Sequence, residues 1–189
     1  RKWKNEFRYV QVEGRKKLAI GGVISDYIPN PTFEVLAAPG AHEKWYRATN
    51  REGLSLRELS GKPIPCPPAY RNGADRLKLM DEQGIHATLI FPTLASAVEE
   101  RMSYDHELMN AVIHSLNEWM HAEWGFHREQ RLFAVPFVTL MDVEMAVAEL
   151  EWALARGARS VGLRPAPVPG YRGSRSPGLP EFDPFWARV

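Results

Sequence analysis

From residue 74 to the end of the chain, helical and strand patterns alternate, and this alternation limits the possible folds more than any other feature. The strand candidates are nearly continuous apolar runs, which indicates strands that are buried on both faces. In chain order the expected elements are helix 74–83, strand 86–91, helix 104–124, strand 133–140, helix 143–156, strand 160–164 and a helix that starts near 183. Helices that alternate with buried strands predict βαβ units around a parallel sheet, either doubly wound or closed into a (β/α)₈ barrel.

Glycines and short polar residues predict where these helices end and begin. Gly84 and Gly157 are expected to end two of them, because glycine readily adopts the left-handed conformation of a helix C-terminus. Ser103 and Asp105 precede the long helix, and Asp142 precedes the next one. We expect these three side chains to cap helices and not to catalyse a reaction.

Residues 1–73 lack this alternation, and they are predicted to form an N-terminal excursion before the barrel portion, 74–189. Residues 17–20 and 23–24 are predicted strands of a β-hairpin, because the two glycines between them supply the positive φ angles of a tight turn. A second irregular stretch is expected over 49–73. Its prolines at 63, 65, 67 and 68 lack the amide hydrogen that a helix needs, which excludes a helix there.

Charge and composition exclude several classes of partner. The formal net charge is +1, and no run of Lys and Arg follows one face, so we expect no nucleic-acid partner. No stretch of about 18 apolar residues is present, so we expect no membrane partner. Cys66 is the single cysteine, which rules out an internal disulfide and fits a reducing, cytoplasmic compartment.

An arginine and a proline-rich loop follow the apolar strand 160–164. In both candidate folds, the loops at the carboxyl ends of the parallel strands build the functional site. Arg164 is therefore either a residue of such a site or a surface residue at a strand end, and the pattern alone favours neither. The residues expected to line a pocket at the strand ends are Phe91, Pro92, Thr93, Thr139, Arg164 and Pro165.

The chemical motifs in the chain are weak. His114, Glu118 and His121 share one face of the long helix, with a spacing that helical di-iron sites use. A second copy of the motif is absent, so we expect these residues to lie on the solvated flank of the helix. The motifs of dinucleotide-binding, phosphate-loop, serine-hydrolase and zincin proteins are also absent.

Five segments taken together resemble the amidohydrolase-related family of metal-dependent TIM barrels. They are 74–84, the strand end 91–93, 117–119, 131–136 and 157–164. The branch they are most similar to contains aminocarboxymuconate-semialdehyde decarboxylase and the resorcylate-type decarboxylases. The resemblance implies a (β/α)₈ TIM barrel of the metal-dependent hydrolase type, present here as an incomplete portion with an N-terminal β-hairpin excursion.

The resemblance also implies a divalent metal, usually zinc. Its ligands would fall before Arg1 and after Val189, so we expect no metal ligand, and name no catalytic residue, within these 189 residues. In the decarboxylase branch an arginine just after the hairpin meets the substrate carboxylate, and the loosely matching position here is Asp26. Our hypothesis is that Arg164 supplies the missing cation.

The resemblance therefore predicts a metal-dependent hydrolase or non-oxidative decarboxylase that acts on a small carboxylate-bearing molecule. We expect a homo-oligomer in which the hairpin acts as a lid or a dimer contact. The alternative is a metal-free binding or assembly subunit that keeps part of the barrel scaffold, with the Gly- and Pro-rich stretches as interaction loops.

Overall fold

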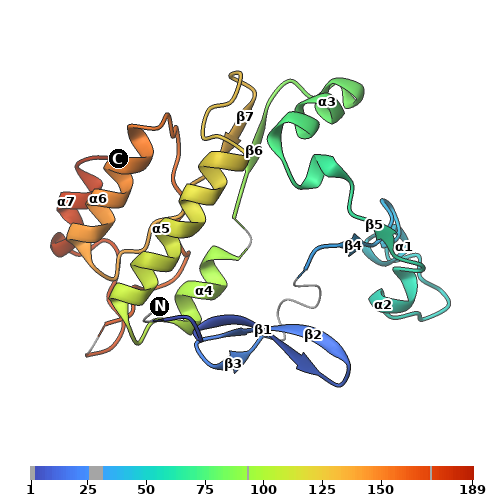
Figure 1. Cartoon of the computed structure of the whole chain (residues 1–189), viewed down its shortest axis with the longest axis horizontal. Coiled ribbons are helices and arrows are strands. Elements are labelled where there is room, and N and C mark those ends of the chain that lie inside the picture. Colours follow the sequence, from blue (N-terminus) through green and yellow to red (C-terminus); the bar gives the residue numbers. More distant parts are fainter. Residues whose placement is uncertain (1–2, 26–31, 93, 171) are drawn as a thin grey trace.

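A computed structural model describes residues 3–25, 32–92, 94–170 and 172–189 of the chain (Figure 1). The strands are β1 (Phe7–Val12), β2 (Arg15–Ile20), β3 (Val23–Ile24), β4 (Val35–Leu36), β5 (Ile64–Pro65), β6 (Thr88–Ile90) and β7 (Leu132–Ala134). The α-helices are α1 (Glu43–Tyr46), α2 (Leu56–Leu59), α3 (Gly73–Gln83), α4 (Ala95–Arg101), α5 (His106–Glu123), α6 (Val143–Leu154) and α7 (Asp183–Trp186), and the 3₁₀ turns are η1 (Pro68–Tyr70) and η2 (Pro180–Phe182).

The three predicted strands are present as parallel segments, but they are shorter than expected. Burial on both faces is wrong for β6, where Leu89 is 53% exposed, and no residue of 160–164 is buried. β6 pairs with β7 in parallel, with Thr88 opposite Leu132. The third predicted strand, 160–164, contributes only one parallel bridge, from Gly162 to Phe137. Pro136 explains the interruption, because proline has no amide hydrogen to give to a ladder. The described residues therefore form an open α/β arrangement without a closed barrel.

The predicted helices over 74–83, 104–124 and 143–156 are confirmed as α3, α5 and α6, with ends within two residues. Each begins at a side-chain cap: Asn72, Asp105 and Asp142 accept the backbone N–H of Asp75, Leu108 and Met145 at 2.9, 3.0 and 3.0 Å. Ser103 is not a cap, since its hydroxyl donates to the carbonyl oxygen of Glu100 at 3.2 Å. Helix α4 is not among the expected elements.

The predicted hairpin is confirmed as β2 and β3, and β1 adds a third antiparallel strand. Gly21 and Gly22 have φ angles of 57° and 75°, as the tight turn requires. The hairpin contacts the segment between α4 and α5: the Tyr104 hydroxyl donates to the Glu6 carboxylate at 2.6 Å. This hydrogen bond raises the pKa of Tyr104 to about 12.

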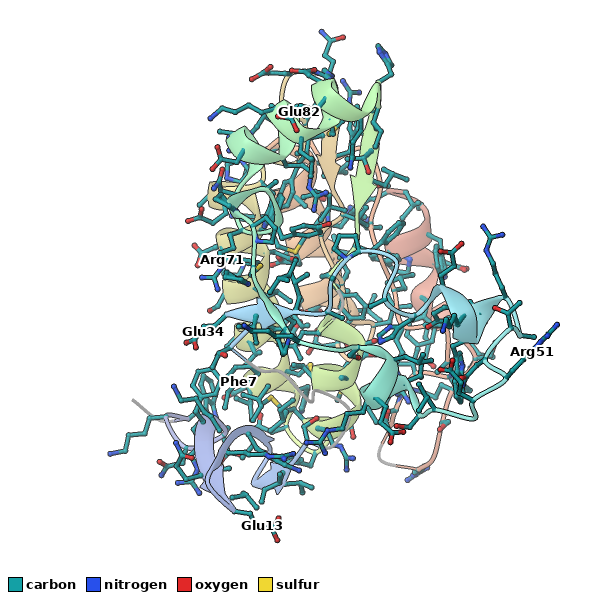
Figure 2. The ribbon with its side chains drawn as sticks, turned by 90° about the vertical axis from the view of Figure 1, so that its right-hand side faces the viewer. Phe7, Glu13, Glu34, Arg51, Arg71 and Glu82 are labelled. Carbon is teal, nitrogen blue, oxygen red and sulfur yellow. The ribbon has the colours of Figure 1, made fainter. Side chains whose placement is uncertain are left out.

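The stretch from 32 to 72 is less irregular than its prolines suggest. Ser55 and Glu58 form a reciprocal capping box at the start of α2. η1 begins at Pro68, where the expectation of no helix is wrong because a proline fits the first turn, whose amide hydrogen has no partner. Figure 1 shows α1, α2, β4 and β5 on the opposite side of the molecule from α6 and α7, and Figure 2 shows Glu82 and Glu13 at opposite ends.

The core consists of three apolar clusters that follow one another along α5 and α6. One joins the hairpin to α4 and α5, the second joins α3 to α5, β7 and α6, and the third joins α6 to α7. Phe126, Phe182 and Phe185 are among the largest side chains that are fully buried. No helix in the described part of the chain is long and apolar enough to cross a membrane.

Asn117 connects these layers through its side-chain amide. It is fully buried on α5, and its Nδ2 donates to the carbonyl oxygen of Phe137 at 2.7 Å while the Phe137 amide donates to its Oδ1 at 2.9 Å. The same Nδ2 donates to Glu149 Oε1 on α6 at 2.7 Å. The amide therefore replaces a strand neighbour at the point where Pro136 interrupts the ladder.

Replacing Asn117 by Ala should lower the free energy of unfolding by about 3 kcal/mol, because the buried N–H and C=O of Phe137 lose their partner. Urea unfolding of the chain measures this loss. Ser115→Ala, at an exposed position of the same helix, is the matched control and should change the value by less than about 0.5 kcal/mol. Equal losses in the two variants would contradict the role given to Asn117.

Gly21 and Gly22, the two glycines of the hairpin turn, allow a second comparison of matched variants. Both have positive φ, so alanine at either position should cost about 1 kcal/mol of unfolding free energy. A Cβ at Gly21 would also lie 2.8 Å from the carbonyl oxygen of Arg101, whereas a Cβ at Gly22 meets nothing within 4 Å. Gly21→Ala should therefore be the more destabilising change in urea unfolding. It should also increase proteolysis of the hairpin, and equal behaviour of the two variants would show that the hairpin does not depend on this contact.

Candidate functional site

Three of the predicted site residues lie together at the carboxyl ends of the parallel segments. Thr139 follows the bridge residue Phe137, and Arg164 and Pro165 follow the bridge residue Gly162. Arg164 and Pro165 line a hollow of about 380 Å³. Ile20 and Ser25 of the hairpin and Ser96 and Glu100 of α4 also line it. The hairpin and α4 thus form the walls of this hollow. Arg164, which follows the parallel segment at Gly162, lies at its edge.

Two carboxylates lie near the cation of Arg164, the exposed Glu100 and the buried Glu99. The Nη2 of Arg164 lies 3.8 Å from Glu100 Oε2, at the long end of the range for an ion pair, and the side chains are 25% and 64% exposed. Such a solvated contact stabilises the protein by at most about 1 kcal/mol. The guanidinium therefore keeps donors that can bind a planar oxyanion through two parallel hydrogen bonds.

Glu99 is the site residue that sequence reasoning missed. Its side chain points into the protein, and the residue is only 4% exposed. Burial raises its pKa, while a hydrogen bond with Thr139 and the charge of Arg164 act in the opposite direction. A void of about 60 Å³ is lined by Glu99 and Arg164. Glu99, Thr139 and Arg164 therefore form one connected group at the strand ends.

A signal for Glu99 is present in the sequence. Ala95, Val98 and Met102 recur at helical spacing, and Glu99 lies four residues after Ala95 on the same stripe. A carboxylate on the apolar face of a helix is buried by the helix's own packing, and buried carboxylates mark candidate functional sites. This signal can be recognised only when residues 95–101 are themselves predicted to be helical.

The other predicted site residues do not join this group. Phe91 is 64% exposed, and it lines with Pro92 a separate, mainly apolar hollow of about 480 Å³ that also contacts Tyr70 and Trp119. Thr93 and Asp26 lie outside the described residues, so their predicted roles stay predictions.

The shared face of His114, Glu118 and His121 is partly exposed and also contacts α6. His114 Nδ1 lies 2.7 Å from Glu149 Oε2 on α6, and its Nε2 lies 3.7 Å from Glu118 Oε1. The rings of His114 and His121 pack edge-on against Trp152 of α6. The face therefore lies on a partly exposed flank of α5, as expected, and its two histidines also contact α6.

The described residues do not provide a metal centre. Nowhere in the described ranges do three or more His, Cys, Asp or Glu side chains lie close enough together to hold an ion. Zinc, which the family resemblance implies, therefore does not fit the residues described here, and we derive no chemical step through it.

Comparison with solved structures identifies a relative of about twice the length. The chain is similar to the crystal structure of an amidohydrolase from Mycobacterium avium subsp. paratuberculosis K-10, with a TM-score of 0.90 and 37% sequence identity. The match covers 99% of this chain and 49% of that structure, so the chain spans about half the length of the amidohydrolase. No family model and no curated protein matches the chain. The likeness supports the amidohydrolase resemblance and a TIM-barrel-like α/β fold.

The buried Glu99 predicts a pH dependence of stability. Its folded-state pKa is raised above the ordinary value of 4.5, so its contribution to stability is complete below that pH and is lost as the pH rises through the folded-state pKa. Glu99→Gln, which cannot ionise, should therefore gain stability relative to the wild type between pH 4 and pH 8. Urea unfolding across this range measures the gain. Glu100→Gln, at an exposed carboxylate, is the control, and a pH-independent difference for Glu99→Gln would contradict the prediction.

Proposed function

We propose that this chain forms part of a metal-dependent, amidohydrolase-related enzyme that hydrolyses or decarboxylates a small carboxylate-bearing molecule. The observation that carries the proposal is the match of 99% of the chain to an amidohydrolase at 37% identity, with Arg164 at the carboxyl ends of the parallel segments. In TIM barrels those ends build the active site.

In this proposal Arg164 binds the substrate carboxylate. Its guanidinium is half-buried beside the hollow of about 380 Å³, where Ser25 and Ser96 add hydroxyl groups. The buried Glu99 lies close enough to interact with the charge of Arg164, and Glu99 is hydrogen-bonded with Thr139. A hollow of this size suits a substrate about as large as a substituted benzoate. We propose that the metal, zinc by resemblance, is held by residues other than those described.

The experiment compares Arg164→Ala with the wild type in the protein as its gene encodes it, using carboxylate-bearing substrates and their methyl esters. Loss of the charge-assisted pair should raise KM for the carboxylate by at least about tenfold, which corresponds to 1.4 kcal/mol. The ester should be affected little, and Arg164→Lys should restore part of the loss. Arg159→Ala, which changes an exposed arginine of another loop, is the control.

An unchanged KM for the carboxylate in Arg164→Ala would overturn the role of Arg164. Absence of both metal and activity from the wild-type protein would overturn the enzyme proposal as a whole.

The second candidate is a binding or assembly subunit, and one surface favours it. Two mainly apolar hollows, of about 400 and 480 Å³, share Leu94 and Leu116 and so form a continuous surface beside α5. Leu89 and Trp119 on this surface are 53% and 51% exposed. Large exposed apolar surfaces mark contacts between proteins. A metal-free, inactive oligomer would favour this candidate over the enzyme.

A further inference from the structure

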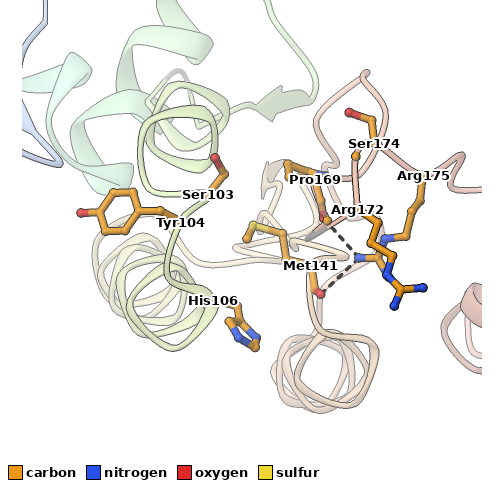
Figure 3. Close-up of a pocket in the computed structure, with 10 residues that line it drawn as sticks. Ser103, Tyr104, His106, Met141, Pro169, Arg172, Ser174 and Arg175 are labelled. Carbon is orange, nitrogen blue, oxygen red and sulfur yellow. Dashed lines mark hydrogen bonds between the residues drawn. The ribbon is translucent and has the colours of Figure 1, made fainter.

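A second hollow with polar walls opens between α5, α6 and the loop after Arg164. It has a volume of about 480 Å³, and it shares no lining residue with the hollow around Arg164. Figure 3 shows Ser103 and His106 on one side of it and Ser174, Arg172 and Arg175 on the other, with Met141 and Pro169 between them. Two segments distant in sequence, 103–106 and 172–175, therefore bring hydrogen-bond donors to one space.

The charge of this hollow differs from that of the first one. None of its lining residues is acidic, whereas Glu100 lines the hollow around Arg164. Two arginines, one histidine and two serine hydroxyls line it instead. Asp142, which caps α6, lies close to His106, with its Oδ2 3.9 Å from the His106 Nδ1. The hollow is therefore suited to an anion.

Arg175 fixes the shape of one wall. Its Nη2 donates to the carbonyl oxygens of Pro169 and Met141 at 3.2 and 3.4 Å, as the dashed lines in Figure 3 show. Its Nη1 pairs with Glu181 at 2.9 Å. A Cβ at Gly170 would lie 3.0 Å from Arg175 Nε, so glycine lets the loop fold closely around this side chain. These contacts hold Arg175 against Pro169, Gly170 and Met141.

Arg172 is the second arginine that lines this hollow. Val168 and Arg175 pair through two backbone hydrogen bonds of 2.8 and 2.9 Å, and the Gly173 amide donates to Gly170 at 3.1 Å. The turn places Arg172 between these bonds, exposed to solvent and without an ion pair to any acidic residue in the described ranges. Its guanidinium therefore keeps donors that can bind an oxyanion.

We propose that this hollow binds the phosphate group of a small organic phosphate ester, with Arg172, His106 and the serine hydroxyls as donors. The planar fork of arginine matches phosphate oxygens in pairs. Met141 and Pro169 form an apolar surface between the two polar walls, and this surface contacts the organic part of the ester. The site is separate from the carboxylate site at Arg164 and does not depend on the proposed enzymatic activity.

The experiment titrates the 189-residue chain with phenyl phosphate and with inorganic phosphate by isothermal calorimetry. Arg172→Ala should weaken the binding of phenyl phosphate by about tenfold or more, which corresponds to 1.4 kcal/mol. Arg51→Ala, which removes an exposed arginine far along the chain, should bind like the wild type. Raised salt should weaken the binding to the wild type more than to Arg172→Ala.

Two further comparisons make the result decisive. Arg164→Ala should bind phenyl phosphate like the wild type, and this separates the new site from the carboxylate site. Tighter binding of phenyl phosphate than of inorganic phosphate supports an ester, and equal binding would overturn the ester in favour of the free ion. No binding below about 10 mM, or equal loss in Arg172→Ala and Arg51→Ala, would overturn the proposal.

Discussion

The side-chain amide of Asn117 is the interaction on which the arrangement of the parallel segments depends. Pro136 cannot donate a hydrogen bond, so the backbone at Phe137 would be left without a strand neighbour on one side. Asn117 supplies one donor and one acceptor to Phe137, and it also contacts Glu149 of α6. This one amide thereby connects the segment at Phe137 to α5, which precedes it in the chain, and to α6, which follows it. The position of Thr139, two residues further, follows from this connection.

The position of the hairpin has a comparable consequence for the charged group at the strand ends. Leu18 and Ile20 pack into the same cluster as Val98 and Met102 of α4. This packing orients α4 so that Glu99, on the same face, is buried near Thr139 and Arg164 while Glu100 stays exposed. The energy of the apolar contacts offsets the cost of burying a carboxylate, and Arg164 and Thr139 reduce that cost. The N-terminal hairpin thus contributes to the electrostatics at the strand ends by packing against α4.

The sequence predicts the long helices well because their signals are local. Asp105, Asp142 and Gly84 mark their ends, and the apolar stripes have helical spacing. Strand lengths are predicted less well, since an apolar run does not reveal that Pro136 breaks the ladder. The site is predicted in part: Thr139, Arg164 and Pro165 follow from strand ends, but Glu99 depends on the contact of α4 with a hairpin nearly eighty residues earlier. Such long-range contacts leave no local pattern.

The loop after Arg164 shows why an apolar segment ends in a charge and several prolines. Arg164 belongs to the hollow at the strand ends, and Arg172 and Arg175 belong to the second hollow. The Nη2 of Arg164 lies 3.8 Å from Glu100 Oε2, and the Nη1 of Arg175 lies 2.9 Å from Glu181 Oε2. Prolines restrict the backbone, and the bridge between Val168 and Arg175 closes the loop on itself. The loop thus connects a hollow lined by Arg164 to a second one lined by Arg172 and Arg175.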